Sequence, residues 1–212
     1  MRAIDSCRVP RVCLAAAFLT TIGVRYETHA VAQDPHPVVG IVVHNNADFP
    51  AFLLDTSELL VTRIYDRAGV TLEWRSARPT PERDRLPPRT VRILIAPPSA
   101  TFSRLPSADV LGFTPAASGH HGGIAYVLAA RVEAVARGYQ VPRGAVLAAA
   151  MAHELGHLLL PDSSHTPTGL MRAQYNQADF RHLMRGELLF APREAGSLRA
   201  GLIVEGQRVA FK

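Results

Sequence analysis

The sequence predicts a single α/β domain of the mixed (α+β) kind. A small mixed β-sheet is expected to pack on two helices, with a helical part at the C-terminal end. Short runs of β-branched and aliphatic residues between residues 38 and 128 indicate buried strands. The region after residue 129 carries the start and stop signals of helices instead. No repeat and no long linker divides the chain, so one domain is expected.

Four segments are expected to form strands, because they are short, apolar and bounded by turn residues. They are residues 38–44, 70–74, 90–96 and 124–128. Residues 76–89 are rich in Pro and Arg and are expected to form a solvated loop. Residues 97–122 are expected to be irregular. The strand at 124–128 follows two glycines and is expected at an edge of the sheet, where an extended peptide could pair with it.

The first helix is expected at residues 50–68, where apolar residues recur every three to four positions. Asp48 is expected to cap its start, and Gly69 stands where a helix would stop. Proline favours the first turn of a helix and disfavours a helical residue before it. A helix is therefore expected to begin near Pro142 and to stop at Pro161. The helices expected after the first one cover residues 129–138, 142–160, 177–189 and 192–202.

Residues 1–32 have the pattern of a signal peptide. Arginines precede the apolar run at residues 12–24, and Ala30-Val31-Ala32 is a typical cleavage sequence. Cleavage would leave residues 33–212 as a secreted catalytic domain, either periplasmic or extracellular. Both cysteines, Cys7 and Cys13, would be removed. The remaining chain would then have no disulfide and only His, Asp and Glu as strong metal ligands.

The charge pattern argues against several partners. The net charge is +5, and the basic residues are spread along the chain without interleaved aromatic residues, so nucleic acid binding is not expected. No apolar run after residue 33 reaches the roughly 18 residues that a membrane-spanning helix needs, so no stable membrane insertion is expected after cleavage. No sequence feature specifies an oligomeric state.

The sequence His-Glu-Leu-Gly-His at residues 153–157 is the most informative motif. Residues four apart lie on one face of a helix, about 5–6 Å apart at Cβ. His153 and His157 can therefore bind one zinc ion, Zn²⁺, with bonds of about 2.0–2.1 Å. Glu154 points off that line but stays near the metal, where it can accept a proton from a water molecule. Zinc is the expected cofactor, and Glu154 is the expected general base.

A catalytic zinc needs a third protein ligand and an open position for water. His165 follows His157 by eight residues, after a helix stop and a run of turn residues that would reverse the chain. We predict His165 as the third ligand. Asp162 and Glu187 remain alternatives, because carboxylate oxygens also bind zinc. His44 and His182 have no assigned role.

The motif, together with His165 and Gly169-Leu170-Met171, resembles the metzincin clan of zinc peptidases. The resemblance implies a zincin-like domain, three zinc-binding histidines, and a tight turn that places Met171 beneath the metal. Family members have a glycine where this chain has Leu160, and their third histidine stands at the position of Ser163, two residues before His165.

The same resemblance suggests a role for Tyr175. In some related peptidases a tyrosine after the methionine assists the transition state, although at a different spacing, so Tyr175 is a candidate stabiliser. The two histidines of the Gly-rich stretch at residues 119–123, His120 and His121, are interpreted as solvated loop residues.

The expected function is zinc-assisted hydrolysis of a peptide or protein substrate. One alternative is a gluzincin-like peptidase that uses Glu187 as its third ligand. The others are a non-catalytic zinc-binding interaction module and a zinc hydrolase that acts on a non-peptide bond.

Overall fold

The computed structural model describes residues 36–76, 87, 89–103, 105, 110–115, 123–162 and 164–210, the last three without side chains. The chain divides into two compact units, Met1–Asp34 and Pro35–Lys212. The predicted signal peptide and both cysteines lie outside the described residues. All of the described helices and strands belong to the second unit. Within the described ranges, no helix is long and apolar enough to span a membrane.

The second unit contains a five-stranded mixed sheet with strand order β2-β1-β3-β5-β4. Its strands are β1 (Val38–Asn45), β2 (Thr71–Ser76), β3 (Thr90–Ala96), β4 (Gly112–Phe113) and β5 (Ile124–Leu128). Strands β2, β1, β3 and β5 are parallel, and β4 runs antiparallel to β5. The predicted mixed α/β fold and all four predicted strands are confirmed.

The edge of the sheet differs from the prediction in one respect. Residues 97–122 were expected to be irregular, yet they contain β4, and β4 rather than β5 is the outer strand. Gly112 pairs with Val127 and Phe113 with Tyr126, and the two aromatic rings stack with centroids 4.9 Å apart. A two-residue strand has no alternation of its own, so its existence depends on the strand beside it.

Five helices complete the described fold: α1 (Ala51–Arg67), α2 (Ala129–Tyr139), α3 (Arg143–Leu159), α4 (Gln177–Met184) and α5 (Pro192–Ala210). The predicted cap of α1 is wrong. Asp48 has a left-handed φ of 53°, and Pro50 occupies the N-cap position without a side-chain hydrogen bond. Asn45 instead binds the backbone N–H and carbonyl of Phe49.

The ends of the helices mostly follow the glycines. Gly69 has a φ of 73°, as expected for the residue that ends α1. Helix α4 stops at Met184, five residues earlier than predicted, because Gly186 adopts a left-handed φ of 75° just beyond it. Helix α5 continues to Ala210 rather than 202, since Gly201 and Gly206 are accommodated within it.

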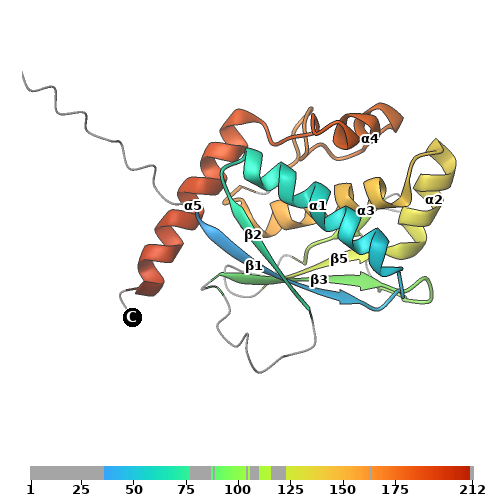
Figure 1. Ribbon diagram of the computed structural model, residues 1–212, viewed down its shortest axis with the longest axis horizontal. Coiled ribbons are helices and arrows are strands. Elements are labelled where there is room, and N and C mark those ends of the chain that lie inside the picture. Colours follow the sequence, from blue (N-terminus) through green and yellow to red (C-terminus); the bar gives the residue numbers. More distant parts are fainter. Residues whose placement is uncertain are drawn as a thin grey trace, which may run out of the picture. The chain divides into compact units, whose positions relative to one another are not determined.

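Helix α3, which carries the His-Glu-Leu-Gly-His motif, is the central helix of the unit. It lies with α1 along one face of the sheet (Figure 1) and also contacts α2, α4 and α5. All of its residues except Arg143 and His157 are buried, as expected for a helix that is apolar on every side. The Tyr65 hydroxyl of α1 donates to the carbonyl of Ala152, 3.1 Å away. The backbone beneath the motif is therefore held on all sides.

Candidate metal centre

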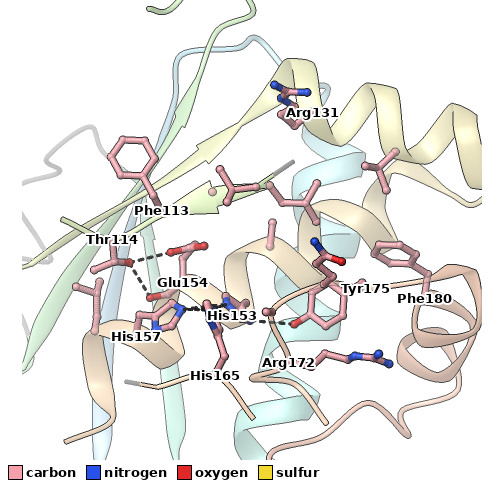
Figure 2. A pocket seen from close by; sticks show the side chains of 18 of the residues that line it. Phe113, Thr114, Arg131, His153, Glu154, His157, His165, Arg172, Tyr175 and Phe180 are labelled. Atoms are coloured by element: carbon pink, nitrogen blue, oxygen red, sulfur yellow. Dashed lines mark hydrogen bonds between the residues drawn. The ribbon is translucent and has the colours of Figure 1, made fainter. Parts of the chain in front are cut away.

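Three histidine side chains converge at the C-terminal end of α3 (Figure 2). His153 and His157 lie one turn apart on α3. The helix ends at Leu160, which is extended (ψ 136°) ahead of Pro161. The loop then returns, and a backbone hydrogen bond of 2.9 Å from Thr166 to the Met171 carbonyl closes it. The return brings His165 to the other two histidines.

The three Nε2 atoms face one another. His157 Nε2 lies 2.9 Å from His153 Nε2, and both lie 3.2 Å from His165 Nε2. Neutral imidazole lone pairs at such distances repel one another unless a proton or a cation lies between them. Tetrahedral zinc with bonds of about 2.0–2.1 Å would hold its nitrogen ligands about 3.3 Å apart. The three donor atoms therefore fit a zinc ion.

His153 is prepared for metal binding by its second ring nitrogen. Nδ1 lies 3.0 Å from the carbonyl oxygen of Leu170. A carbonyl only accepts, so Nδ1 carries the proton and Nε2 keeps its lone pair. Burial lowers the pKa of His153 to about 4, with a further contribution from His157 and His165. The imidazole is therefore neutral at physiological pH, as a metal ligand must be.

Tyr175 supports the same ring. Its hydroxyl lies 3.2 Å from His153 Nδ1 and donates to the Leu170 carbonyl. Burial is the main reason that the pKa of this phenol is raised well above its usual value, so it remains a donor at any working pH. In this arrangement the hydroxyl lies on the Nδ1 side of the ring, away from the three converging Nε2 atoms.

Met171 packs beneath the metal-binding turn of α3. It is fully buried, and a Cβ added to Gly156 would lie only 2.5 Å from Met171 Sδ. The turn before it is set by Gly169, which has a φ of 78°, and by a hydrogen bond from Leu170 N–H to the Leu189 carbonyl. The glycine at position 156 therefore lets the methionine side chain lie directly against the helix.

Glu154 lies beside the histidines but faces the edge strand. Glu154 is 5% exposed, and the Thr114 hydroxyl lies 3.0 Å from its Oε2. Burial raises the pKa of Glu154 to about 8, and the hydrogen bond from Thr114 opposes this rise. A divalent cation beside the carboxyl would favour its ionised form. A Cβ added to Gly112 would lie 2.9 Å from Glu154 Cγ, so the edge strand passes directly against the carboxylate.

The histidines and Glu154 line a cavity of about 910 Å³, which is within the range of ligand-binding sites. Its walls come from the segment around β4, from one face of α2, from α3, and from the chain between Arg172 and Phe180. The metal centre is thus open to solvent and to a molecule of peptide size.

The rival ligands lie elsewhere. Asp162 is exposed and accepts a hydrogen bond from the backbone N–H of Ser164. Glu187 is exposed and paired with Arg185. Within the described part of the chain, His153, His157 and His165 are the only such group with donor atoms close enough to share a metal ion. His120, His121 and Ser163 lie outside the described residues.

Sequence reasoning missed three contributors to the centre. Thr114 lies forty residues from Glu154, in a segment expected to be irregular. Gly112 gave no signal of its close approach to α3. The third contributor is a backbone carbonyl, that of Leu170, which no residue type predicts. Only the turn residues before Met171 hinted that this segment would fold back beneath the helix.

Comparisons with known proteins add little to this geometry. No protein-family model matches the chain, and no curated protein matches it at a significant level. Among solved structures, the fold is similar to an archaemetzincin from Methanopyrus kandleri, with 16% sequence identity and a TM-score of 0.44, over 82% of this chain and 99% of that chain. A likeness this distant does not bear on the site, whose assignment rests on its own side chains.

Proposed function

We propose that this protein is a secreted zinc-dependent metallopeptidase, with His153, His157 and His165 as zinc ligands and Glu154 as general base. The observation that carries the proposal is the convergence of three imidazole Nε2 atoms at 2.9–3.2 Å, with a buried carboxylate next to them at an open cavity. A purely structural zinc site is closed by a fourth protein ligand. Among the residues that the structure describes, this cluster has three donors, and it opens onto a cavity.

A zinc ion, when bound here, supplies Lewis acidity and lowers the pKa of a coordinated water to about 7. Glu154 would accept the proton of the attacking water and then deliver it to the leaving amine nitrogen. Burial of Glu154 shields its carboxylate from bulk solvent. The Thr114 hydroxyl holds Oε2 in place through a hydrogen bond. Thr114 acts through Glu154 and is therefore a positioning residue.

A peptide is favoured as substrate by the edge strand. No strand pairs with the outer side of β4 among the described residues, so an extended peptide could add to the sheet there. Its backbone would then pass the carboxylate of Glu154, which the Cβ position of Gly112 almost touches. This arrangement would hold the scissile bond within reach of the base.

The test measures metal content and peptide hydrolysis on the same preparations. Wild type is expected to bind one zinc ion and to cleave peptides from a mixed-sequence library. Glu154→Gln should retain zinc and lose most activity, while His165→Ala should lose zinc and activity together. The exposed His182→Ala on α4 is the matched control and should resemble wild type.

Each alternative function predicts a different result in these assays. Zinc bound without turnover of any peptide would indicate an interaction module, and turnover of an ester or amide probe alone would indicate a non-peptide hydrolase. A wild-type chain without stoichiometric zinc would refute the proposal. Export is tested separately, by sequencing the N-terminus of the protein recovered outside the cytoplasm, which should begin at Gln33.

A further inference from the structure

We infer that the cavity beside the metal centre selects a carboxylate of the substrate, which binds Arg131. The inference rests on the proposed function, because it names the class of peptide that the site would prefer. It starts from the part of the cavity that the chemistry of the metal centre does not use. That part lies between α2 and α3, and Figure 2 shows Arg131 on α2 at the end remote from the histidines.

One face of α2 forms the wall of this part of the cavity. Arg131, Val135 and Gly138 line it, together with neighbouring residues of the same face. They are three to four positions apart and therefore share one side of the helix. On α3, Ala150 lies one turn before His153 and Glu154 and also lines the cavity. Its small side chain leaves room between the two helices, so the space is continuous from the metal centre to Arg131.

The charges of the described residues around the cavity give Arg131 no counterion. Among the described residues, no carboxylate forms an ion pair with it. The acidic residue nearest to it in α2, Glu133, is paired with Arg143. The other arginine of the lining, Arg172, is neutralised by both carboxylate oxygens of Asp179, each 3.0 Å away. Of the residues that the structure describes, Arg131 is thus the cation that this end of the cavity offers to a ligand.

The surroundings of Arg131 favour a particular shape of ligand. Val135, one turn along the same face of α2, gives the cavity an apolar wall beside Arg131. This wall would contact the methylene groups of a side chain. Arg131 is partly buried, and its guanidinium can bind a carboxylate with two parallel hydrogen bonds. An aliphatic stem that ends in a carboxylate satisfies both features. The carboxylate can come from an acidic side chain near the scissile bond or from the C-terminus of a short peptide.

The test compares peptides that differ in one charge. Zinc-loaded wild type is assayed with a peptide series in which each position near the cleavage site carries Glu, Gln or Leu, with the C-terminus free or amidated. If the carboxylate is a side chain, kcat/KM should be about tenfold higher with Glu than with Gln at one position. If it is the C-terminus, kcat/KM should be about tenfold higher with the free acid than with the amide. This is the size expected for a charged hydrogen bond at a half-buried site. These two arms distinguish the side chain from the C-terminus.

Variants of α2 test whether Arg131 causes the preference for a carboxylate. Arg131→Gln should abolish the preference, so that the Glu and Gln peptides are cleaved at equal rates by this variant. Arg131→Glu should reverse it, so that an added peptide with Lys at the same position is cleaved faster than the Glu peptide. Arg137→Gln removes an exposed arginine of the same helix that does not line the cavity, and it should keep the wild-type preference. Equal cleavage of Glu and Gln peptides and of free and amidated ends, or a preference that survives Arg131→Gln, would overturn the inference.

A binding measurement separates this inference from the proposed function. Fluorescently labelled members of the same peptide series are titrated with zinc-loaded Glu154→Gln, with and without Arg131→Gln. Tighter binding of the carboxylate peptide, lost in the double variant, would support the role of Arg131 even if wild type cleaved no peptide. Indistinguishable binding of the Glu, Gln and amidated peptides would exclude that role even if the protein proved to be an active peptidase.

Discussion

Replacement of Tyr175 by Phe tests how the metal centre is supported. The change removes one hydroxyl and keeps the ring, which packs edge-to-face against Phe180 with centroids 5.8 Å apart. The hydroxyl contacts His153 Nδ1 at 3.2 Å and donates to the Leu170 carbonyl. Without it, His153 keeps its hydrogen bond to that carbonyl at 3.0 Å. The substitution therefore weakens the orientation of the imidazole without abolishing it.

The expected size of the effect follows from this partial loss. Removing an outer-shell partner of a zinc-bound histidine costs 10–100-fold in metal affinity or activity. Because one of the two Nδ1 contacts of His153 survives, we expect the lower end for Tyr175→Phe, about a tenfold weaker affinity for zinc, or about 1.4 kcal/mol. The metal-free Tyr175→Phe protein should be about 1 kcal/mol less stable than metal-free wild type, because it lacks the hydrogen bond to the Leu170 carbonyl.

The assay is competition for zinc against a chromophoric chelator, followed by peptide hydrolysis at saturating zinc. Tyr126→Phe is the control, since its ring stacks on Phe113 of the edge strand and does not contact the histidines. If the hydroxyl acts through His153, saturating zinc should restore most of the activity of Tyr175→Phe. If it stabilises the transition state directly, kcat should stay about 100–1,000-fold low at saturating zinc. Unchanged zinc affinity in Tyr175→Phe would refute the positioning role.

Substitutions at three other positions test the rest of the structure. Thr114→Val should lower kcat about tenfold with zinc retained, because the hydroxyl holds Glu154 Oε2 at 3.0 Å. Thr114→Ser keeps a hydroxyl and should have the wild-type kcat, and an equal loss of kcat in both variants would contradict this role. Gly112→Ala should destabilise the fold by about 1–3 kcal/mol, as its Cβ would lie 2.4 Å from the Tyr126 carbonyl oxygen, and an unchanged melting temperature would count against the close contact. Burial raises the pKa of Glu58 to about 7, so the folded state holds a proton that the unfolded chain releases near pH 4.5. The free energy of unfolding should therefore fall by about 1 kcal/mol as the pH rises from 4.5 to about 7. The fall is smaller than the full pKa shift implies, because the carboxyl group is partly solvated. Glu58→Gln should flatten this pH dependence in denaturant titrations, and an identical profile in both proteins would contradict it.

The sequence alone determined the features that depend on local periodicity. The four longer strands, the position of α3 and the side-by-side placement of His153 and His157 follow from the spacing of residues along the chain. A helix repeats every 3.6 residues, so the shared face of those two histidines was fixed before any tertiary contact. The prolines and turn residues after α3 also indicated that the chain reverses there, and His165 does lie against both rings.

Tertiary structure alone decided what surrounds these histidines. The edge strand β4 exists because β5 pairs with it, and it carries Thr114 next to Glu154 across forty positions of sequence. The carbonyl that orients His153 belongs to Leu170, and every residue has a carbonyl. Arg131 faces the cavity because α2 packs against α3. Periodicity is a local property of the backbone, whereas these contacts depend on how segments far apart in sequence pack together.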